Sequence, residues 1–234
     1  MTKKEILDAI HGQMIISCQA VEGEPLYVEE KSIMYLMARA AKQAGTPAIR
    51  TSSIRDVIAI KEETGLPVIG LVKVQYPGYE GFITPTMKEV DDLVAAGSDI
   101  VALDCTLRKR GDGSTVNEFI AQIREKYPDI ILMADISNYE EGINAWKCGV
   151  DIVGTSMSGY TAYTSSVSDG PDYELMERLS RDINIPVIGE GRIHYPDQAV
   201  KALQTGAWAI VVGGAITRPL EIAMRFQNAI KESR

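Results

Sequence analysis

Short apolar runs alternate with longer amphipathic segments along the entire chain. From these runs we predict eight strands, at residues 14–19, 48–52, 67–73, 100–106, 131–137, 152–156, 186–190 and 209–213. Within each run the apolar residues are continuous rather than alternating with polar ones, as in parallel strands that are covered on both faces. The segments between them, such as 53–65 and 117–128, place apolar residues at helical spacing. The pattern therefore predicts strands and helices in alternation.

Four glycines mark where predicted helices end. Gly45, Gly97, Gly149 and Gly206 each close an amphipathic segment, and a β-branched run begins shortly after each of them. Glycine is common just beyond a helix C-terminus because it adopts the left-handed backbone conformation without strain. Eight strand-then-helix units in 234 residues predict one (β/α)8 barrel that spans residues 1–234 as a single domain.

The composition is that of an acidic globular protein. Hydrophobic residues make up 45% of the chain, and the formal net charge of −8 argues against nucleic acid or an anionic membrane surface as a partner. No apolar run approaches the roughly 20 residues that span a bilayer, and the first residues lack the apolar core of a signal peptide. The three cysteines are far apart in the sequence. We therefore expect free thiols in a reducing cytosol, and hence a cytoplasmic protein.

Polar residues end nearly every predicted strand. In a (β/α)8 barrel the active-site groups come from the C-terminal ends of several strands. At these ends the chain places, in order, Gln19, Arg50, Lys73, Asp104, Asp135, Ser156, Glu190, Gly213 and Gly214. The two aspartates either orient a catalytic group or cap the turns that follow their strands. A ring of charged groups around one mouth favours a catalytic or ligand-binding role over a structural one.

Two predicted strands share the sequence Pro-Val-Ile-Gly and end in charged residues. The first of them ends in Lys73. In the second, Glu190 takes the position equivalent to Leu71. Because side chains alternate between the faces of a strand, Leu71 and Lys73 share one face, which corresponds to the face of Glu190. Strands three and seven lie opposite each other in an eight-membered ring, so Lys73 and Glu190 flank a substrate from two sides if this face is the inner one.

A lysine at a desolvated mouth has chemistry that a solvated lysine lacks. Burial and neighbouring cations lower the pKa of the ammonium, so Lys73 can act as a general base or form a Schiff base with a carbonyl. The structural alternative for Lys73 is an ion pair with Glu190 or Asp104. For Glu190 the structural alternative is an ion pair with Arg192 or Arg218.

The segments after the last two predicted strands have the features of an anion site. Gly191 and Arg192 follow strand seven, and Gly213 and Gly214 follow strand eight, with Arg218 shortly beyond. Loops in these two positions of a barrel frequently bind phosphate through backbone N–H groups and a helix N-terminus. Glycine lets the backbone approach an anion, and arginine adds a fork of donors that matches phosphate oxygens. We therefore predict a barrel of the phosphate-binding type.

Three loops at the same end of the predicted barrel are long. They cover residues 74–86, 107–115 and 157–171. Loops of this length frequently serve as lids or substrate walls. Their aromatic side chains either cover a ligand or pack the loops onto the rim: Tyr76, Tyr79, Phe82, Tyr160 and Tyr163.

No metal or nucleotide motif appears in the sequence. Histidine, cysteine and acidic residues show no metal-ligand spacing, and neither a P-loop nor a GxGxxG turn opens a helix. His11 precedes the first predicted strand, at the end of the barrel away from catalysis, and His194 lies in the loop after strand seven. We expect His11 to be a surface or packing residue, and His194 either to be incidental or to shuttle protons. We expect the protein to need neither a metal nor a cofactor.

Seven segments of the chain together resemble one enzyme family. They are ISCQAVEGEPLY (16–27), IRTSS (49–53), YPGYEGFITPT (76–86), MADIS (133–137), GTSMSGYTAYT (154–164), GEGRIHYPDQA (189–199) and VVGGAITRP (211–219). In this order they resemble the N-acetylmannosamine-6-phosphate 2-epimerases, essentially from end to end. The resemblance implies a phosphate-binding (β/α)8 barrel without a cofactor. It also implies interconversion of N-acetylmannosamine 6-phosphate and N-acetylglucosamine 6-phosphate in sialic acid and amino-sugar breakdown.

The resemblance also implies roles for residues at the strand ends. Lys73 and Glu190 are similar to the family's catalytic lysine and glutamate. Gln19 and Arg50 are similar to its substrate-binding residues, and Asp135 is similar to the residue that holds the lysine or the sugar. The strand-eight glycines and the arginine that follows them are similar to its phosphate grip.

The expected reaction is removal and return of the C2 proton, and the expected partner is a small amino-sugar phosphate. The first alternative is an aldolase-type lyase that acts on a sugar phosphate through a Schiff base at Lys73. The second is a phospho-sugar binding protein without catalysis. The N-terminal segment 1–13 is expected to cover the bottom of the barrel or a partner subunit, which leaves a homodimer as an open alternative.

Overall fold

Eight parallel strands close into a barrel in the computed structural model of this protein, which describes residues 1–165 and 170–233. Each strand pairs with its neighbours in sequence, and the eighth pairs with the first to close the ring. The strands are β1 (Met14–Ser17), β2 (Ile49–Ser52), β3 (Val68–Leu71), β4 (Ile100–Asp104), β5 (Ile131–Asp135), β6 (Ile152–Gly154), β7 (Val187–Glu190) and β8 (Ala209–Val212). The predicted (β/α)8 barrel is confirmed.

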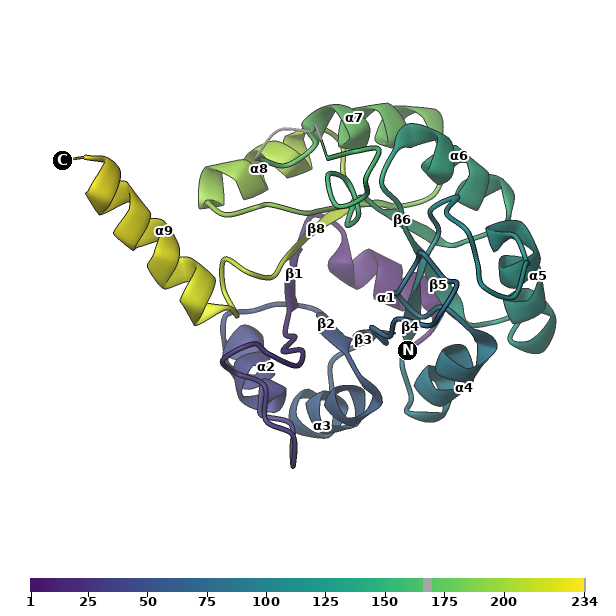
Figure 1. Cartoon of the computed structure of the whole chain (residues 1–234), viewed down its shortest axis with the longest axis horizontal. Helices are drawn as coiled ribbons and strands as arrows, with labels where there is room; N and C mark the ends of the chain where they lie inside the picture. The colour runs from purple at the N-terminus through teal and green to yellow at the C-terminus, as the bar shows by residue number, and fades with distance from the viewer. Residues whose placement is uncertain (166–169, 234) are drawn as a thin grey trace.

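Helices alternate with the strands and surround most of the barrel (Figure 1). In the described residues they are α1 (Lys3–Ile10), α2 (Met34–Gln43), α3 (Ile54–Thr64), α4 (Met87–Ala95), α5 (Val116–Lys126), α6 (Tyr139–Lys147), α7 (Tyr173–Asp182), α8 (Pro196–Gln204) and α9 (Pro219–Glu232). Local sequence explains several of their ends. At α5, for example, the Thr115 hydroxyl accepts from the Glu118 N–H (3.2 Å), and the Glu118 carboxylate accepts from the Thr115 N–H (2.7 Å).

The strands lie where the apolar runs predicted them, but most end one or two residues earlier than predicted. The predicted strand 67–73, for example, ends at Leu71. Lys73 lies beyond the ladder because its backbone pairs with Ile83 of the following loop instead of with a neighbouring strand. Several of the polar residues predicted at strand ends therefore belong to the loops that begin there.

The four glycines predicted to end helices do so. Gly45, Gly97, Gly149 and Gly206 follow the even-numbered helices α2 to α8, and their φ angles lie between 83° and 95°. A residue with a Cβ is strained in this left-handed region. Each of these helices is thereby stopped where the chain turns into the next strand.

Apolar side chains form separate clusters inside the barrel and between the barrel and its helices. Leu71 and Ile188 belong to the cluster that fills the barrel, whereas Val187 packs outward against the helices. Side chains two residues apart share a face of a strand. Lys73 and Glu190 therefore continue the inward-facing series of Leu71 and Ile188, toward the C-terminal mouth.

Helix α1 closes the opposite end of the barrel. Ile6 and Ile10 are buried in the cluster that fills the barrel. Trp208 donates from Nε1 to the Leu7 carbonyl (2.9 Å), and His11 stacks on Trp208 with ring centroids 3.9 Å apart. The N-terminal segment thus covers the bottom of the barrel, and His11 has a packing role.

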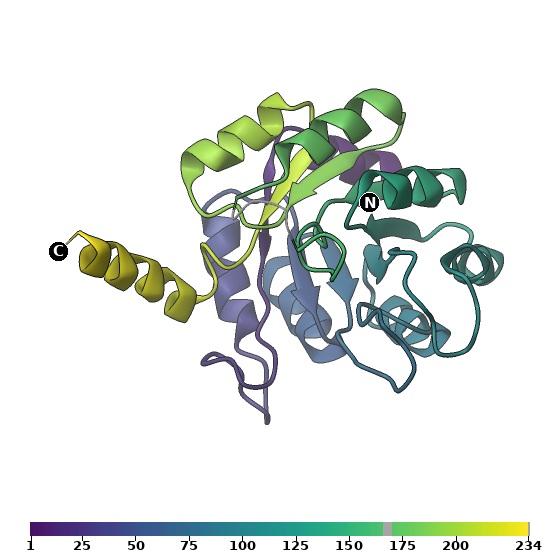
Figure 2. The same ribbon diagram turned by 45° about the horizontal axis from the view of Figure 1, so that its top comes forward.

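The last helix, α9, leaves the barrel instead of packing on it. Figures 1 and 2 show that it points away from the space between α8 and α2. None of its residues is buried, and Leu220, Met224, Phe226 and Ile230 are between 51% and 70% exposed. Apolar residues gathered on an exposed surface mark a site of contact with another molecule.

Two other findings concern membrane-spanning helices and the cysteines. None of the helices in the described residues is long and apolar enough to cross a membrane. Cys18, Cys105 and Cys148 are free thiols, and the first two are buried. Burial, with the nearby Asp56 carboxylate, raises the pKa of Cys18 to about 12, which leaves that thiol unreactive.

Candidate active site

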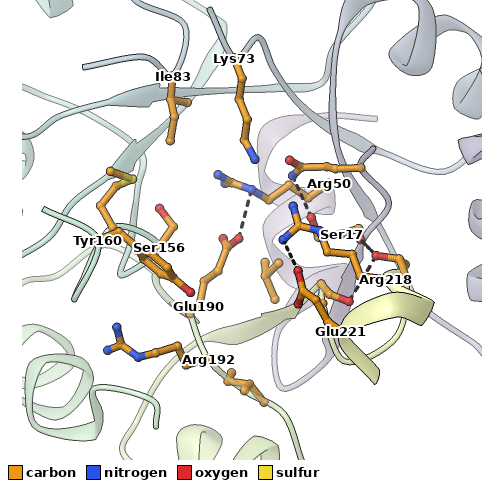
Figure 3. A pocket seen from close by; sticks show the side chains of 18 of the residues that line it. Ser17, Arg50, Lys73, Ile83, Ser156, Tyr160, Glu190, Arg192, Arg218 and Glu221 are labelled. Carbon is orange, nitrogen blue, oxygen red and sulfur yellow. Dashed lines mark hydrogen bonds and ion pairs between the residues drawn. The ribbon is translucent and has the colours of Figure 1, made fainter. Parts of the chain in front are cut away.

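A polar cavity of about 350 Å³ opens at the C-terminal ends of the strands (Figure 3). Its wall contains most of the residues that the sequence predicted for the site: Gln19, Arg50, Lys73, Glu190, Gly191, Arg192, Gly213, Gly214 and Arg218. The remaining one, Asp135, is fully buried and contacts two residues of the wall, Arg50 and Ser156. The closed barrel thus brings together groups that lie far apart in the sequence.

Lys73 is held by a short antiparallel pairing within the loop after β3. Its backbone pairs with Ile83, and the adjacent Thr84 N–H donates to the Val72 carbonyl (2.7 Å). Thr84 has a φ of 46°, which is rare for a β-branched residue, and its hydroxyl donates to the Ala102 carbonyl of β4 (2.7 Å). The strained residue fixes the loop to the neighbouring strand. Lys73 consequently extends into the cavity from a rigid base (Figure 3).

The surroundings of Lys73 disfavour its protonated form. Burial lowers the pKa of the Lys73 ammonium below its ordinary value, and the positive charges of Arg218 and Arg50 lower it further. The Glu190 carboxylate acts in the opposite direction without reversing the shift. Glu190 and Asp104 were the two carboxylates that the sequence offered as ion-pair partners of Lys73. Among the described residues they pair with arginines instead, Glu190 with Arg50 and Asp104 with Arg108.

Glu190 ends β7 and faces Lys73 across the cavity (Figure 3). Thr155 fixes its backbone, accepting from the Glu190 N–H (3.0 Å) and donating to the Glu190 carbonyl (2.9 Å). Burial, opposed by Arg50 and reinforced by Asp135, raises the pKa of Glu190 to about 7. The positive charge of Lys73 also opposes this shift. A carboxyl with such a pKa can donate as well as accept a proton near neutral pH.

A buried ion pair supports the floor of the cavity. Arg50 Nη2 donates to Asp135 Oδ2 (2.7 Å), and the Ser156 hydroxyl donates to Asp135 Oδ1 (2.7 Å). Arg50 Nε lies 3.4 Å from Glu190 Oε1. Burial opposes the charge on Arg50, but Asp135 and Glu190 outweigh it, so the pKa of Arg50 lies above its ordinary value. The ion-pair partner of Glu190 is therefore Arg50, not either of the two arginines considered from the sequence.

Three buried polar atoms of the wall have no hydrogen-bond partner among the described residues. They are Gln19 Oε1, Arg50 Nε and Glu190 Oε2. Buried polar atoms are nearly always paired in native proteins. Gln19 is oriented by Ser17, whose hydroxyl accepts from Gln19 Nε2 (2.8 Å). Gln19 Oε1 and Glu190 Oε2 can therefore pair with polar groups of a ligand, whereas Arg50 Nε already faces Glu190 Oε1.

Glycine-containing turns after β7 and β8 form the other end of the cavity. Gly191 and Arg192 adopt φ angles of 105° and 54°, so the chain turns sharply after Glu190. The N–H groups of Gly213 and Gly214 donate to no acceptor in the part of the chain that the structure describes. Unpaired backbone N–H groups at such turns are suited to an anion.

The two arginines predicted for this end have different surroundings. Arg218 lines the cavity and makes ion pairs with Glu24 (3.0 Å) and Glu221 (3.1 Å). The Arg192 guanidinium instead donates to two backbone carbonyls, those of Ser158 and Gly170 (2.8 Å each). Its side chain therefore holds the loop after β6, which the sequence did not predict, while its backbone shapes the turn beside the cavity.

Two other titratable residues of the predicted mouth take different positions. Asp104 makes an ion pair with Arg108 (2.6 Å) and accepts from Thr106, and it is not part of the cavity wall. Burial raises the pKa of Asp104 even so. His194 does line the cavity, and its Nδ1 lies 3.4 Å from Arg225 of α9.

The long loops contribute both wall and packing contacts. Phe82 and Tyr160 line the cavity. The other three aromatic residues contact the rest of the protein: Tyr76 with Glu89, Tyr79 with Arg110, and Tyr163 with Glu141. Residues 166–169 of the predicted loop 157–171 lie outside the described residues.

Several residues of the cavity wall were not predicted from the sequence. Ser17 precedes Gln19 by two residues and so shares its face of the strand, a signal that strand alternation offers. Ile83 reaches the wall only through the pairing with Lys73, which no local pattern predicts. Glu221 lies three residues after Arg218, and this helical spacing brings the two side chains together.

The fold and the cavity together define a class of protein. A closed barrel with a polar cavity at the C-terminal strand ends is the arrangement of barrel enzymes. The cavity holds a desolvated lysine opposite a carboxyl, with the glycine-containing turns after β7 and β8 beside them. Within the described residues, no group of His, Cys, Asp and Glu side chains is arranged to hold a metal ion. The protein is thus a barrel enzyme of the acid–base type.

Comparison with known proteins gives the family. Residues 34–232 match the NanE family model, described as "Putative N-acetylmannosamine-6-phosphate epimerase", and the chain belongs to this family. A relative from Caldanaerobacter subterraneus subsp. tengcongensis is described as "Putative N-acetylmannosamine-6-phosphate 2-epimerase". It is 54% identical to this protein, over 98% of this chain and 96% of its own length. A relative from Enterobacter sp. is 46% identical over 97% of each chain. The solved N-acetylmannosamine-6-phosphate 2-epimerase of Clostridium perfringens superposes with a TM-score of 0.90, at 48% identity over 96% of both chains. The resemblance predicted from the sequence is confirmed.

Proposed function

We propose that this protein interconverts N-acetylmannosamine 6-phosphate and N-acetylglucosamine 6-phosphate by moving the proton on C2. Its family and relatives are named for this substrate. The observation that carries the mechanism is the pair Lys73 and Glu190, which face one cavity with pKa values shifted toward each other. A base with a lowered pKa and an acid with a raised pKa are what proton transfer near neutral pH needs.

The C2 proton of the sugar becomes acidic when C1 is a carbonyl. Ring opening supplies that aldehyde, because O1 loses its proton and O5 gains one as the C1–O5 bond breaks. We assign Lys73, in its unprotonated form, to the removal of the C2 proton. The electron pair moves into a C1–C2 double bond, and the charge rests on the C1 oxygen as an enolate. The epimer forms when a proton is added to the other face of C2, either by the Lys73 ammonium after the enolate has reoriented or by a second acid on that face.

We assign Glu190, in its protonated form, to the oxygens at C1 and in the ring. Its carboxyl can give a proton to O5 and take the proton that O1 loses as the ring opens. Glu190 is then protonated again and can donate a hydrogen bond to the enolate oxygen. A fixed donor in a desolvated site stabilises developing negative charge because it does not have to reorient during the reaction. Arg50 contacts Glu190 and is held by Asp135, so it orients the carboxyl and adds positive charge beside the enolate.

We assign the 6-phosphate to the glycine-lined end of the cavity. The free N–H groups of Gly213 and Gly214 and the guanidinium of Arg218 are donors that suit phosphate oxygens. The turn at Gly191 and Arg192 borders the same end. The unpaired oxygen of the Gln19 amide is available to a sugar hydroxyl or the N-acetyl N–H group.

Proton NMR in D2O tests this function. The purified protein is incubated with N-acetylmannosamine 6-phosphate and no added cofactor. We expect signals of N-acetylglucosamine 6-phosphate with deuterium at C2, because a proton taken up by a lysine amine exchanges with solvent. N-acetylmannosamine without the phosphate serves as the control. Its conversion should be slower by about tenfold or more, since charge-assisted hydrogen bonds are worth about 1.5–3 kcal/mol each.

Two outcomes would contradict the proposal. A reaction mixture with neither product nor deuterium exchange would reject the epimerase. Loss of activity when borohydride is added together with substrate would instead indicate a Schiff base at Lys73, as in an aldolase-type lyase. We expect activity to survive borohydride, because the proposed proton transfers form no covalent bond to the enzyme.

We also propose that the protein is a homodimer in which each α9 packs on the barrel of the partner. In a (β/α)8 barrel the helices form an outer ring, yet α9 points away from its own ring (Figure 2). The helices beside the place that α9 leaves open have exposed apolar residues on their surface, among them Leu36 of α2 (44% exposed) and Val200 of α8 (56% exposed). The apolar residues of α9 match this surface in character, and exchange of an identical helix is a common route to a dimer.

Charge on the apolar face of α9 tests the dimer. Wild-type protein should sediment with twice the mass of one chain. Phe226→Asp together with Ile230→Asp, two residues four apart on one face of α9, should give monomers, because each apolar side chain contributes about 1.5–3 kcal/mol when buried and a carboxylate resists burial. Asn228→Asp places the same charge on the polar side of the helix and should leave the dimer intact. Monomeric wild-type protein would contradict the exchange.

The net charge and the cysteines bear on the compartment of the enzyme and on its binding partner. We propose that residues 1–234 act as one domain in the cytoplasm, on a small amino-sugar phosphate and not on nucleic acid. The net charge of −8 supports this choice of partner, and the free thiols, two of them buried, support a reducing compartment.

A further inference from the structure

Arg218, at the end of the cavity assigned to phosphate, is flanked by two carboxylates. Glu24, from the loop between β1 and α2, places Oε1 3.0 Å from Arg218 Nη2. Glu221, in the first turn of α9, places Oε1 3.1 Å from Arg218 Nη1. Figure 3 shows Glu221 beside Arg218 at the edge of the cavity. Each of the two terminal guanidinium nitrogens of Arg218 is therefore paired with a carboxylate of the protein itself.

The two carboxylates are held differently. Glu24 Oε2 accepts from the Val21 N–H (3.0 Å), so Glu24 is fastened to its own loop, and it does not line the cavity. Glu221 does line the cavity, and its Oε2 lies against the Gly214 backbone, where a Cβ built on that glycine would collide with it. Glu24 therefore holds Arg218 from outside the cavity wall, whereas Glu221 is itself part of that wall.

The position of Glu221 overlaps the place that suits a phosphate group. The N–H groups of Gly213 and Gly214 are free among the described residues, and Arg225 lies nearby, with Nη2 3.4 Å from the Gly214 carbonyl. An anion drawn to these donors would meet the Glu221 carboxylate. Two unit charges 4 Å apart repel by about 1 kcal/mol in bulk water and by about 4 kcal/mol near a protein surface. Phosphate and the Glu221 carboxylate cannot both occupy this place without that cost.

We infer that Glu221 is an internal competitor for the phosphate group, which sets the affinity for phosphorylated substrate, and that Glu24 is a positioning residue for Arg218. The inference rests on the proposed function in one respect, the assignment of this end of the cavity to phosphate. Phosphate binding moves Glu221 away from Gly214 and takes over one side of the guanidinium, while Glu24 keeps the other. Removal of the two charges should therefore have opposite effects.

Titration calorimetry with inorganic phosphate, alongside steady-state kinetics, tests the inference. Glu221→Gln should bind inorganic phosphate about three- to tenfold more tightly than the wild type, because a competing charge is removed while the shape of the side chain is kept. Its kcat/KM should rise by a similar factor. Glu24→Gln should weaken phosphate binding by about threefold or more, because Arg218 loses its fixed partner. Added salt should shrink both differences, since screening weakens interactions between partly exposed charges.

The control for both variants is Glu62→Gln, which removes one exposed negative charge from α3. It should bind phosphate as the wild type does. If Glu221→Gln binds phosphate no more tightly than the wild type, or if Glu24→Gln also tightens binding, the inference is overturned while the epimerase function stands. If the variants shift phosphate binding in opposite directions but the protein shows no C2 exchange, the inference holds and the proposed reaction fails.

Discussion

Replacement of Lys73 by methionine is expected to lower kcat by about 10²–10⁴-fold, the usual contribution of a general base. At 1.36 kcal/mol per tenfold change, this corresponds to a barrier higher by about 3–5 kcal/mol. Methionine keeps the length and apolar stem of the side chain, so the pairing with Ile83 should persist. Substrate conversion and deuterium uptake at C2 should fall together, because one group starts both. The NMR assay in D2O measures both quantities.

Lys109→Met is the matched control for that substitution. Lys109 is an exposed lysine in the loop after β4, so the control removes the same charge outside the cavity wall. It should retain wild-type turnover. Addition of a small primary amine should restore part of the activity of Lys73→Ala, which leaves space for the amine, but should not affect Lys109→Met. Turnover of Lys73→Met within tenfold of the wild type would remove Lys73 from the mechanism.

The barrel was predictable because its signals are local. Continuous apolar runs indicate strands with two covered faces, and each of the glycines 45, 97, 149 and 206 stops a helix by its own backbone conformation. Nothing in either signal depends on the rest of the chain. The strand ends were less predictable, because Lys73 leaves the ladder only through its pairing with Ile83, ten residues further along.

The site was predictable as a set of residues and less so as a set of contacts. The C-terminal ends of parallel strands must meet at one mouth, so a polar residue such as Gln19 or Glu190 could be placed there by topology alone. The inward direction of Lys73 could not, because both faces of its strand are apolar. Partner choice depends on the closed ring, which sets Arg50 of β2 against Asp135 of β5 and Glu190 of β7.

Two features of the chain's second half show why other contacts were missed. The Arg192 guanidinium donates hydrogen bonds to the backbone carbonyls of residues 158 and 170. The sequence around Arg192 gives no sign of these acceptors. Helix α9 has the same mixture of apolar and polar residues as the helices that pack on the barrel. An amphipathic pattern predicts that a helix has an apolar face, but not which molecule covers it.

Replacement of Glu190 by glutamine is expected to lower kcat by about 10²-fold or more and to change the shape of the pH profile. In the wild type the reactive form of the pair carries one proton, on Glu190, with Lys73 neutral. Activity should therefore follow a bell-shaped pH profile, because it needs Lys73 without its proton and Glu190, whose pKa is raised to about 7, with its proton. Because the two groups interact, the two limbs of the profile describe the pair as a whole.

Glutamine donates a hydrogen bond at every pH, so the fall in activity on the alkaline side should disappear in Glu190→Gln. The acid limb should remain, and in this variant it reflects the loss of a proton from Lys73 alone. Glu125→Gln, an exposed substitution on α5, should keep both limbs of the wild-type profile. An alkaline fall that persists in Glu190→Gln would show that another group supplies the proton. The profile of kcat/KM for the three proteins between pH 5 and pH 10 decides the matter, since only loss of that one acid removes the alkaline limb.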